Sequence, residues 1–240
     1  MSNAGVDPIE VDGVSKSFGS FLALNQISFS VPLGCMALMA GSNGAGKSTI
    51  LRLLAGLGRP SHGRIHVDGA DPVRTPTVRR RIGLLSHHTM LYEDLTAAEN
   101  LHFAARLYGL PERNSRIREA LDSAGLQDRA HHRVRNFSRG MKQRLALTRA
   151  TLHEPSILLL DEPFTGLDQR AGEWLTVQLM EILGRGCSGI LVTHQMESAV
   201  QIADRLLILR RGRICFDAPW ERGDLQSLTA TYRNFLDESL

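Results

Sequence analysis

Gly41-Ser42-Asn43-Gly44-Ala45-Gly46-Lys47-Ser48-Thr49 decides the fold of this 240-residue chain. The stretch fits the pattern G-x-x-x-x-G-K-[ST], in which glycines let the backbone curl tightly and approach an anion. In such a loop the backbone N–H groups cradle phosphates, the lysine reaches the β- and γ-phosphates, and the hydroxyl ligates Mg²⁺. We therefore predict that residues 41–49 bind a nucleoside triphosphate through Lys47, with Ser48 as a ligand of the metal ion.

The residues on either side supply the strand and the helix that such a loop connects. Residues 35–40 are an apolar run typical of a buried strand, and residues 50–55 are good helix formers that stop near Gly56 and Gly58. The N-terminus of that helix would add its dipole to the phosphate site. A chance glycine-rich turn would lack this strand–loop–helix order, so we favour the nucleotide-binding interpretation.

The hydrophobic pattern of the strands changes along the chain and predicts an α/β fold with a mixed core sheet. Hydrophobic residues alternate with polar ones at 9–11 and 27–31, which predicts an N-terminal antiparallel β-subdomain. The apolar runs at 157–160, 190–192 and 206–209 are instead typical of parallel strands that are covered on both faces.

The middle of the chain is predicted to be helical. Helical stretches at 97–107, 113–124 and 140–152 together form a helical subdomain at about 96–153. A further helix is expected at 171–183, between two of the apolar strands.

Two carboxylates follow the apolar strand at 157–160. In a protein with this phosphate loop, Asp161 would lie beside Mg²⁺ at the carboxyl end of the strand, where ligands of α/β sheets collect. Glu162, one residue further, would polarise the water that attacks the γ-phosphate. The alternative is that the two acidic residues are merely solvent-exposed at the end of the strand. The presence of the phosphate loop argues against this alternative. The predicted metal ligands are therefore Ser48 and Asp161, with Glu162 in the catalytic role.

Composition excludes several other classes of protein. No window approaches the ~20 apolar residues that cross a bilayer, and residues 1–8 show no apolar secretory signal. The three isolated cysteines are typical of a reducing compartment rather than of a disulfide framework. The net charge of +3 is a mild bias, and the arginines at 79–81 and 210–211 are expected to be solvated, so no nucleic-acid partner is expected.

Further motifs give the chain a specific resemblance. Asn136-Phe137-Ser138-Arg139-Gly140-Met141-Lys142-Gln143-Arg144 resembles the signature motif of the ATP-binding-cassette (ABC) ATPases, and it precedes Asp161 at that family's spacing. Thr165-Gly166-Leu167-Asp168 resembles the family's D-loop, and Val192-Thr193-His194 resembles its switch histidine. Phe18 occupies the place of the aromatic residue that stacks on adenine. The resemblance covers residues 9–216 and implies an ATPase that binds ATP and Mg²⁺.

The resemblance also implies a site that two copies of the chain share. The helix beginning at Ser138, with Arg139, Gly140 and Met141, would cap the γ-phosphate held by the phosphate loop of a second copy in a head-to-tail dimer. Asp168 would cross the same interface, and His194 would contact the γ-phosphate and hold the attacking water. ATP would close this dimer and hydrolysis would open it.

The chain departs from the family pattern in two places. The family's glutamine after the strand at 82–85 is missing, and counting back from Asp94 puts His87 in its position, with His88 as the alternative. Because Mg²⁺ prefers hard oxygen ligands, His87 would act in catalysis through a water or a hydrogen bond. Arg139 and Met141 stand where the family has Gly and Gln, and the added charge of Arg139 would either help or hinder closure.

The same resemblance predicts the kind of cassette. One ABC ATPase domain at 9–217, a short helical tail at 218–240 and no membrane span predict a cytoplasmic subunit, peripheral on the inner face of the cell membrane, that docks on an integral membrane permease. Residues 84–92 and 137–141 resemble the haem-exporter ATPases of cytochrome c maturation. An exporter of drugs, lipids or polysaccharides fits almost as well.

Two other classes match less well. Non-transport cassettes of translation or DNA repair typically carry two cassettes per chain or a long coiled-coil insertion, and this sequence has neither. A P-loop kinase or GTPase would leave the motifs at 136–144 and 165–168 unexplained, and there is no Asn-Lys-x-Asp guanine-reading element.

Overall fold

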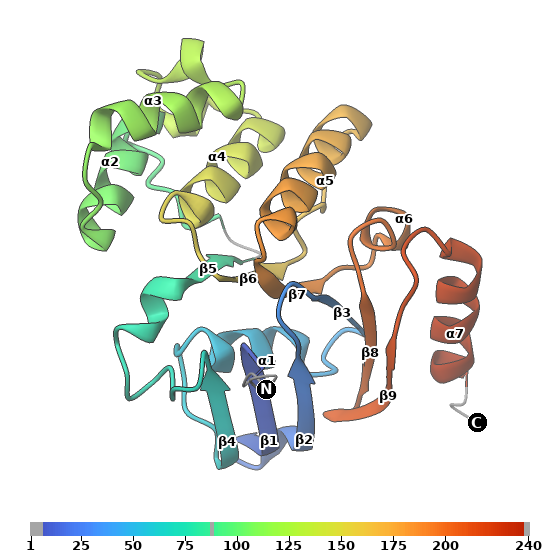
Figure 1. Ribbon diagram of the computed structural model, residues 1–240. Coiled ribbons are helices and arrows are strands. Elements are labelled where there is room, and N and C mark those ends of the chain that lie inside the picture. The colour runs from blue at the N-terminus through green and yellow to red at the C-terminus, as the bar shows by residue number, and fades with distance from the viewer. Residues whose placement is uncertain (1–6, 87–88, 238–240) are drawn as a thin grey trace, which may run out of the picture.

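A small antiparallel sheet forms the N-terminal part of the structure. The computed structural model describes residues 7–86 and 89–237 (Figure 1). The small sheet consists of β2 (Phe21–Val31), β1 (Ile9–Phe18) and β4 (His62–Val67), in that spatial order. Ile9 pairs with Val31 on one side and with Val67 on the other, and all three are buried, so the alternating pattern directs one face of the sheet into the core.

The larger sheet is parallel except at one edge. Its order is β5-β6-β7-β3-β8-β9, and β9 alone runs antiparallel to its neighbour. The strands are β5 (Ile82–Leu85), β6 (Ile157–Asp161), β7 (Ser188–Val192), β3 (Met36–Ala40), β8 (Arg205–Arg210) and β9 (Arg213–Pro219). These two sheets confirm the predicted α/β fold with an antiparallel N-terminal sheet and a mixed core sheet.

The strand order brings distant motifs to one edge of the larger sheet. β3 leads into the phosphate loop, and β7 lies between β3 and β6. Because parallel strands place their carboxyl ends at the same edge, the phosphate loop, Glu162 and His194 follow three neighbouring strands at one edge. Asp161 pairs with Val192 across β6 and β7, which aligns these ends.

Helices cover both faces of the larger sheet. Helix α1 (Lys47–Leu54) packs between the two sheets, where Ile50 and Leu54 are fully buried. On the opposite face lie α5 (Gln169–Gly184), the short α6 (Met196–Ala199) and α7 (Leu225–Asp237) (Figure 1). The predicted helix at 171–183 is confirmed as the main part of α5.

Three helices form a block with its own hydrophobic core. They are α2 (Ala97–Tyr108), α3 (Arg113–Ser123) and α4 (Arg139–Thr151), and they lie together above the sheets in Figure 1. Thr96 and Glu99 form a capping box at the start of α2. The three predicted helices are confirmed to within two residues at each end. Short 3₁₀ turns complete the structure: η1 (Val78–Arg81), η2 (Gln127–Arg129) and η3 (Val134–Asn136).

Strand β9 was not predicted from the sequence. Its residues alternate between exposed and half-buried positions, and the strand pairs only with β8, at the edge of the sheet. It extends to Pro219, past the boundary predicted at 217. The helix that follows, α7, packs on the core through Leu228, which is fully buried, and through Tyr232 and Phe235.

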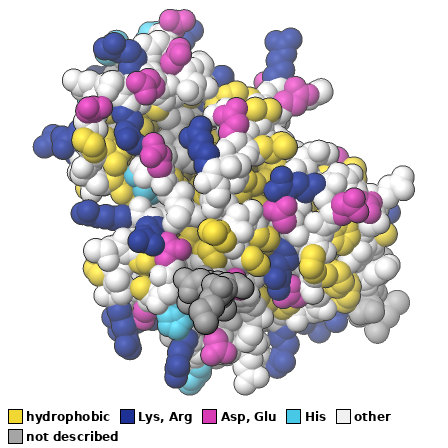
Figure 2. Space-filling model, viewed as in Figure 1, with side chains coloured by type: hydrophobic (Ala, Val, Ile, Leu, Met, Phe, Trp, Pro, Cys, Tyr) yellow, Lys and Arg dark blue, Asp and Glu magenta, His cyan; other side chains and the backbone are white. Residues whose placement is uncertain are grey.

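The surface carries charges of both signs. On the face shown in Figure 2, Lys and Arg side chains are interspersed with Asp and Glu rather than gathered in a basic stripe. Among residues 7–86 and 89–237, no helix combines the length and the apolar character needed to cross a membrane.

Candidate nucleotide-binding and catalytic site

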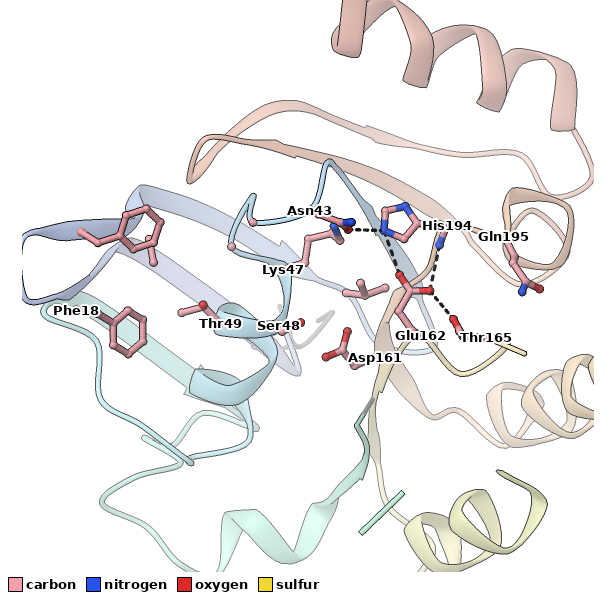
Figure 3. A pocket seen from close by; sticks show the side chains of 15 residues that line it. Phe18, Asn43, Lys47, Ser48, Thr49, Asp161, Glu162, Thr165, His194 and Gln195 are labelled. Atoms are coloured by element: carbon pink, nitrogen blue, oxygen red, sulfur yellow. Dashed lines mark hydrogen bonds and ion pairs between the residues drawn. The ribbon is translucent and has the colours of Figure 1, made fainter. Parts of the chain in front are cut away.

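A pocket of about 650 Å³ lies at the carboxyl edge of the larger sheet (Figure 3). Its walls come from β1 and β2, the phosphate loop with α1, and the residues that follow β6 and β7. The residues that line it are Phe18, Phe21, Ala23, Asn43, Gly44, Gly46, Lys47, Ser48, Thr49, Asp161, Glu162, Thr165, Val192, His194 and Gln195. The pocket therefore brings together most of the residues that the sequence predicts for one copy's nucleotide site.

Two glycines allow the phosphate loop to pack closely against its neighbours. Gly46 has a φ of 111° at the start of α1, and a Cβ there would lie 2.6 Å from Leu24 Cδ2. A Cβ on Gly41 would lie 2.2 Å from the carbonyl oxygen of Leu209. The N–H of Gly212 also donates to the Ala45 carbonyl at 3.0 Å. A Cβ on Gly46 would also lie 2.8 Å from the Ala23 carbonyl oxygen, so a side chain at either position would clash with neighbouring backbone.

Lys47 is the buried cation of the site. Its Nζ donates to the carbonyl oxygens of Gly41 at 2.7 Å and Ser42 at 2.9 Å, so the side chain lies along its own loop. Burial lowers the pKa of Lys47, and the carboxylates of Glu162 and Asp161 partly offset this effect. The ammonium group therefore lies along the phosphate loop, where it can contact the oxygens of a bound phosphate.

Glu162 is held in place by its backbone and by hydrogen-bond donors. Thr165 Oγ1 donates to Oε2 at 3.2 Å, and the backbone N–H of His194 donates to the same oxygen at 3.3 Å. The φ of Glu162 is 54°, and its N–H donates to the Val192 carbonyl at 2.8 Å. A non-glycine residue adopts this left-handed conformation only where its surroundings enforce it, often at functional sites. The chain thus turns at Glu162 so that the carboxylate stays in the pocket.

His194 connects the phosphate loop to Glu162. Its Nε2 lies 3.2 Å from Asn43 Oδ1 and 3.4 Å from Glu162 Oε1 (Figure 3). Both neighbouring atoms are acceptors, so these contacts require a proton on Nε2. His194 is therefore oriented as a hydrogen-bond donor at the end of the pocket where the carboxylate lies.

Ser48 and Asp161 offer oxygen atoms to a cation in the same pocket. Hard oxygen ligands are those that Mg²⁺ prefers, and Mg²⁺ usually combines one or two protein ligands with phosphate oxygens and water. In the part of the chain that the structure describes, no three His, Cys, Asp or Glu residues gather as a metal cluster. These residues thus fit Mg²⁺ bound together with a nucleotide rather than a metal held by the protein alone.

Two aromatic residues line the other end of the pocket. Phe18 is 57% exposed and Phe21 is 62% exposed, and the Nζ of Lys16 lies 5.1 Å from the centroid of the Phe18 ring. Figure 3 places Phe18 at the side of the pocket opposite Glu162 and His194. A triphosphate on the loop could thus extend its base towards Phe18.

Replacing Phe18 by Ala is expected to weaken ATP binding by about tenfold, because stacking of one base on an aromatic ring contributes about 1–3 kcal/mol. The affinity for inorganic tripolyphosphate should not change, since it carries no base. Calorimetric titration of both ligands would measure this. Leu22→Ala is the matched control, because Leu22 is 45% exposed on the same strand pair but does not line the pocket. Equal losses for ATP and tripolyphosphate would refute a stacking role.

A second set of predicted site residues does not line this pocket. Ser138 caps α4, and its hydroxyl accepts a hydrogen bond from the Met141 N–H at 3.2 Å. Asp168 caps α5 in the same way, accepting from the Ala171 N–H at 2.9 Å. The N-terminus of α4, with Arg139 and Gly140, therefore lies outside the chain's own nucleotide pocket.

The structure also shows where Arg139 lies. Its guanidinium sits so close to Gly166 that a Cβ on this glycine would come within 2.3 Å of Arg139 Cζ. Arg139 thus links the signature segment to the 165–168 segment within one copy. His87, the remaining predicted catalytic residue, lies outside the described residues, as does His88, and its role stays a prediction.

Several pocket residues were not among those predicted from the sequence. Thr165 and Gln195 line the pocket, and Thr165 bonds the Glu162 carboxylate directly. Thr165 could have been predicted from its position only three residues after Glu162, which brings its hydroxyl within reach of the carboxylate. Phe21 was also missed, although the signal was local: the Gly19-Ser20 turn that places Phe21 opposite Phe18 lies between the two residues in the sequence.

Comparisons with known proteins agree on the family. The ABC transporter family matches residues 24–165. The chain is 40% identical over 217 residues to the Nod factor export ATP-binding protein I of Rhizobium johnstonii, which covers 88% of this chain and 70% of that protein. It is 41% identical over 209 residues to the daunorubicin resistance ATP-binding protein DrrA3 of Streptomyces coeruleorubidus, covering 86% of this chain and 66% of that protein.

Similar solved structures also belong to ABC transporters. One, described as the ATP-binding subunit of an ABC transporter, has a TM-score of 0.85 at 32% identity and covers 94% of this chain and 99% of that one. A dimeric ATP-binding cassette with ADP and phosphate bound has a TM-score of 0.79 at 27% identity, covering 88% and 98%. The chain belongs to the ABC transporter ATPase family, which implies nucleotide binding and ATP hydrolysis.

Proposed function

We propose that this chain is the ATP-hydrolysing subunit of an exporter, and that two copies close around ATP to drive a separate membrane permease. The main support for the proposal is that the predicted site residues fall into two separate groups. One copy offers Lys47, Glu162 and His194 in its pocket, while the α4 N-terminus capped by Ser138 lies outside that pocket. An anion-binding helix terminus of this kind can serve a second copy. The dimeric cassette among the similar structures supports this arrangement.

The roles of the residues follow from their positions. Lys47 would exchange its bonds to the Gly41 and Ser42 carbonyls for contacts with the β- and γ-phosphates. Mg²⁺ held by Ser48 and Asp161 would supply charge neutralisation on those phosphates when bound. Glu162 would take a proton from water as the water oxygen bonds to the γ-phosphorus, and the bond to the bridging oxygen would break to release ADP. His194 would donate from Nε2 to a γ-phosphate oxygen.

The proposal of an exporter rests on the names of relatives. The Nod factor export protein and the daunorubicin resistance protein support export. The narrower expectation of a haem exporter of cytochrome c maturation receives no support from these relatives. We therefore propose the exporter class without a named substrate, and a peripheral position on the inner membrane face through the permease. The non-transport alternative in translation or DNA repair is not favoured.

The experiment is affinity capture from native membranes. Tagged Glu162→Gln protein, incubated with ATP and Mg²⁺ and added to detergent-solubilised membranes of the native organism, should retain a multi-spanning membrane protein identified by mass spectrometry. Lys47→Ala protein in the same extract is the control for ATP-dependent capture. Recovery of ribosomes or nucleic acid in place of a membrane protein would contradict the transport proposal and support the alternative.

A further inference from the structure

Arg139 is an exposed cation in an electrostatically unfavourable place. It is the first residue of α4, where the helix dipole already presents positive charge. Within residues 7–86 and 89–237 its side chain forms no ion pair, whereas Arg135, four residues earlier, pairs with Asp94 at 3.3 Å. Packing, rather than a counter-ion, therefore accounts for where the Arg139 side chain lies.

The guanidinium of Arg139 lies face-on against the backbone of Gly166. A Cβ on Gly166 would come within 2.3 Å of Arg139 Cζ, 2.4 Å of Nη1 and 2.5 Å of Nε. Nearly equal distances to three atoms of one plane put the flat face of the guanidinium over the glycine. Any side chain on Gly166 would therefore occupy the space that the guanidinium fills, so the two residues are complementary in shape.

A second side chain of α4 holds the same segment. Gln143 lies one turn after Arg139, on the same side of the helix, and its Nε2 donates to the Pro163 carbonyl at 2.6 Å. One face of α4 thus contacts the chain directly after Glu162 and again at Gly166.

The segment held in this way carries a hydrogen-bond donor to the Glu162 carboxylate. Thr165, the residue before Gly166, donates from Oγ1 to Glu162 Oε2 at 3.2 Å. The Thr165 backbone N–H also donates to the Glu162 carbonyl at 3.2 Å. A shift of Gly166 would therefore move Thr165 and change the position of the carboxylate, and a small misplacement of a reacting group is enough to slow a reaction.

We propose that Arg139 is a positioning residue for ATP hydrolysis. Its guanidinium packs on Gly166 and keeps Thr165 in place, and Thr165 in turn orients the carboxylate of Glu162. The inference rests on the proposed function, because it assigns Arg139 a role in the hydrolysis step. The residue acts within its own copy through the planar shape of its side chain, and not through its charge at the phosphates of a second copy.

Steady-state kinetics can separate shape from charge. Arg139→Gly should lower kcat for ATP about tenfold and leave KM within about twofold, because Arg139 does not line the chain's own nucleotide pocket. Arg139→Lys should lower kcat to a similar extent, since an ammonium group keeps the charge but cannot lie flat on a peptide group. Arg113→Gly is the matched control and should keep the wild-type kcat, because Arg113 is also the exposed first residue of a helix and lies outside the pocket.

A double-mutant cycle tests whether Arg139 acts through Gly166. Gly166→Ala should displace the guanidinium and lower kcat about tenfold in the otherwise unchanged protein. In Arg139→Gly protein the same change should lower kcat by less than about threefold, because no guanidinium remains to be displaced. The φ of Gly166 is 69°, so alanine has a backbone cost there, but this cost is common to both proteins and cancels in the cycle.

Hydrogen exchange of the nucleotide-free subunit tests the contact apart from hydrolysis. The hydrogen bond from the Thr165 N–H to the Glu162 carbonyl protects an amide inside the segment. Its exchange, followed by mass spectrometry of the peptide that spans 163–168, should be about tenfold faster in Arg139→Gly and in Arg139→Lys. Arg113→Gly should exchange at the wild-type rate.

Different results would overturn the inference. Wild-type kcat in Arg139→Gly or in Arg139→Lys would exclude a role for the planar group, and a raised KM that Arg139→Lys restores would assign the residue to the partner's phosphates instead. Additive effects in the cycle, or unchanged exchange of 163–168, would show that Arg139 does not act through Gly166. If Glu162→Gln fails to dimerise with ATP while exchange is still faster in Arg139→Gly, the failure lies in the proposed function and not in this contact.

Discussion

Glu162→Gln is expected to slow ATP hydrolysis by about a thousandfold while ATP remains bound. The amide is nearly isosteric with the carboxylate and can still accept hydrogen bonds from Thr165 Oγ1 and the His194 N–H. It cannot take a proton from the attacking water. The phosphate loop, Lys47 and the metal ligands are unchanged, so affinity for ATP should change by less than about threefold. Single-turnover hydrolysis and equilibrium binding, measured separately, would test both statements.

Glu119→Gln is the matched control for this variant. Glu119 is exposed on α3 and does not line the nucleotide pocket, so the same change of carboxylate to amide should leave hydrolysis at the wild-type rate. Hydrolysis by Glu162→Gln at the wild-type rate would show that another group accepts the proton. A loss of ATP affinity equal to the loss of rate would show that Glu162 acts in binding.

Lys47→Ala is expected to weaken ATP binding by about a hundredfold, because a charge-assisted hydrogen bond contributes about 1.5–3 kcal/mol. The change also removes the donor to the Gly41 and Ser42 carbonyls, so thermal unfolding must be measured beside binding. Lys142→Ala is the control, since Lys142 pairs with Glu93 away from the pocket. Wild-type ATP affinity in a folded Lys47→Ala protein would remove Lys47 from the phosphate site.

Local patterns were sufficient to predict much of the fold and of the candidate site. The phosphate loop, Asp161 and Glu162 are contiguous with strands whose apolar runs are unmistakable, so their common location follows from the carboxyl ends of parallel strands. Helices α2, α3 and α4 were predicted from the helical pattern of their own residues, and the Thr96–Glu99 capping box marks the start of α2.

Features that depend on long-range contacts could not be predicted in this way. β9 is an edge strand whose exposed–half-buried alternation gives a weak hydrophobic signal. The contact between Arg139 and Gly166 joins two segments that are distant in the chain, and the sequence of neither segment indicates this contact.

A measurement of molecular mass tests most directly whether the nucleotide site is divided between two copies of the chain. Glu162→Gln protein with ATP and Mg²⁺, examined by size-exclusion chromatography with light scattering, should have twice the monomer mass. It should return to the monomer mass with ADP, and Lys47→Ala should remain monomeric with either nucleotide. A monomer for Glu162→Gln at saturating ATP, with the nucleotide demonstrably bound, would contradict a site that a second copy completes.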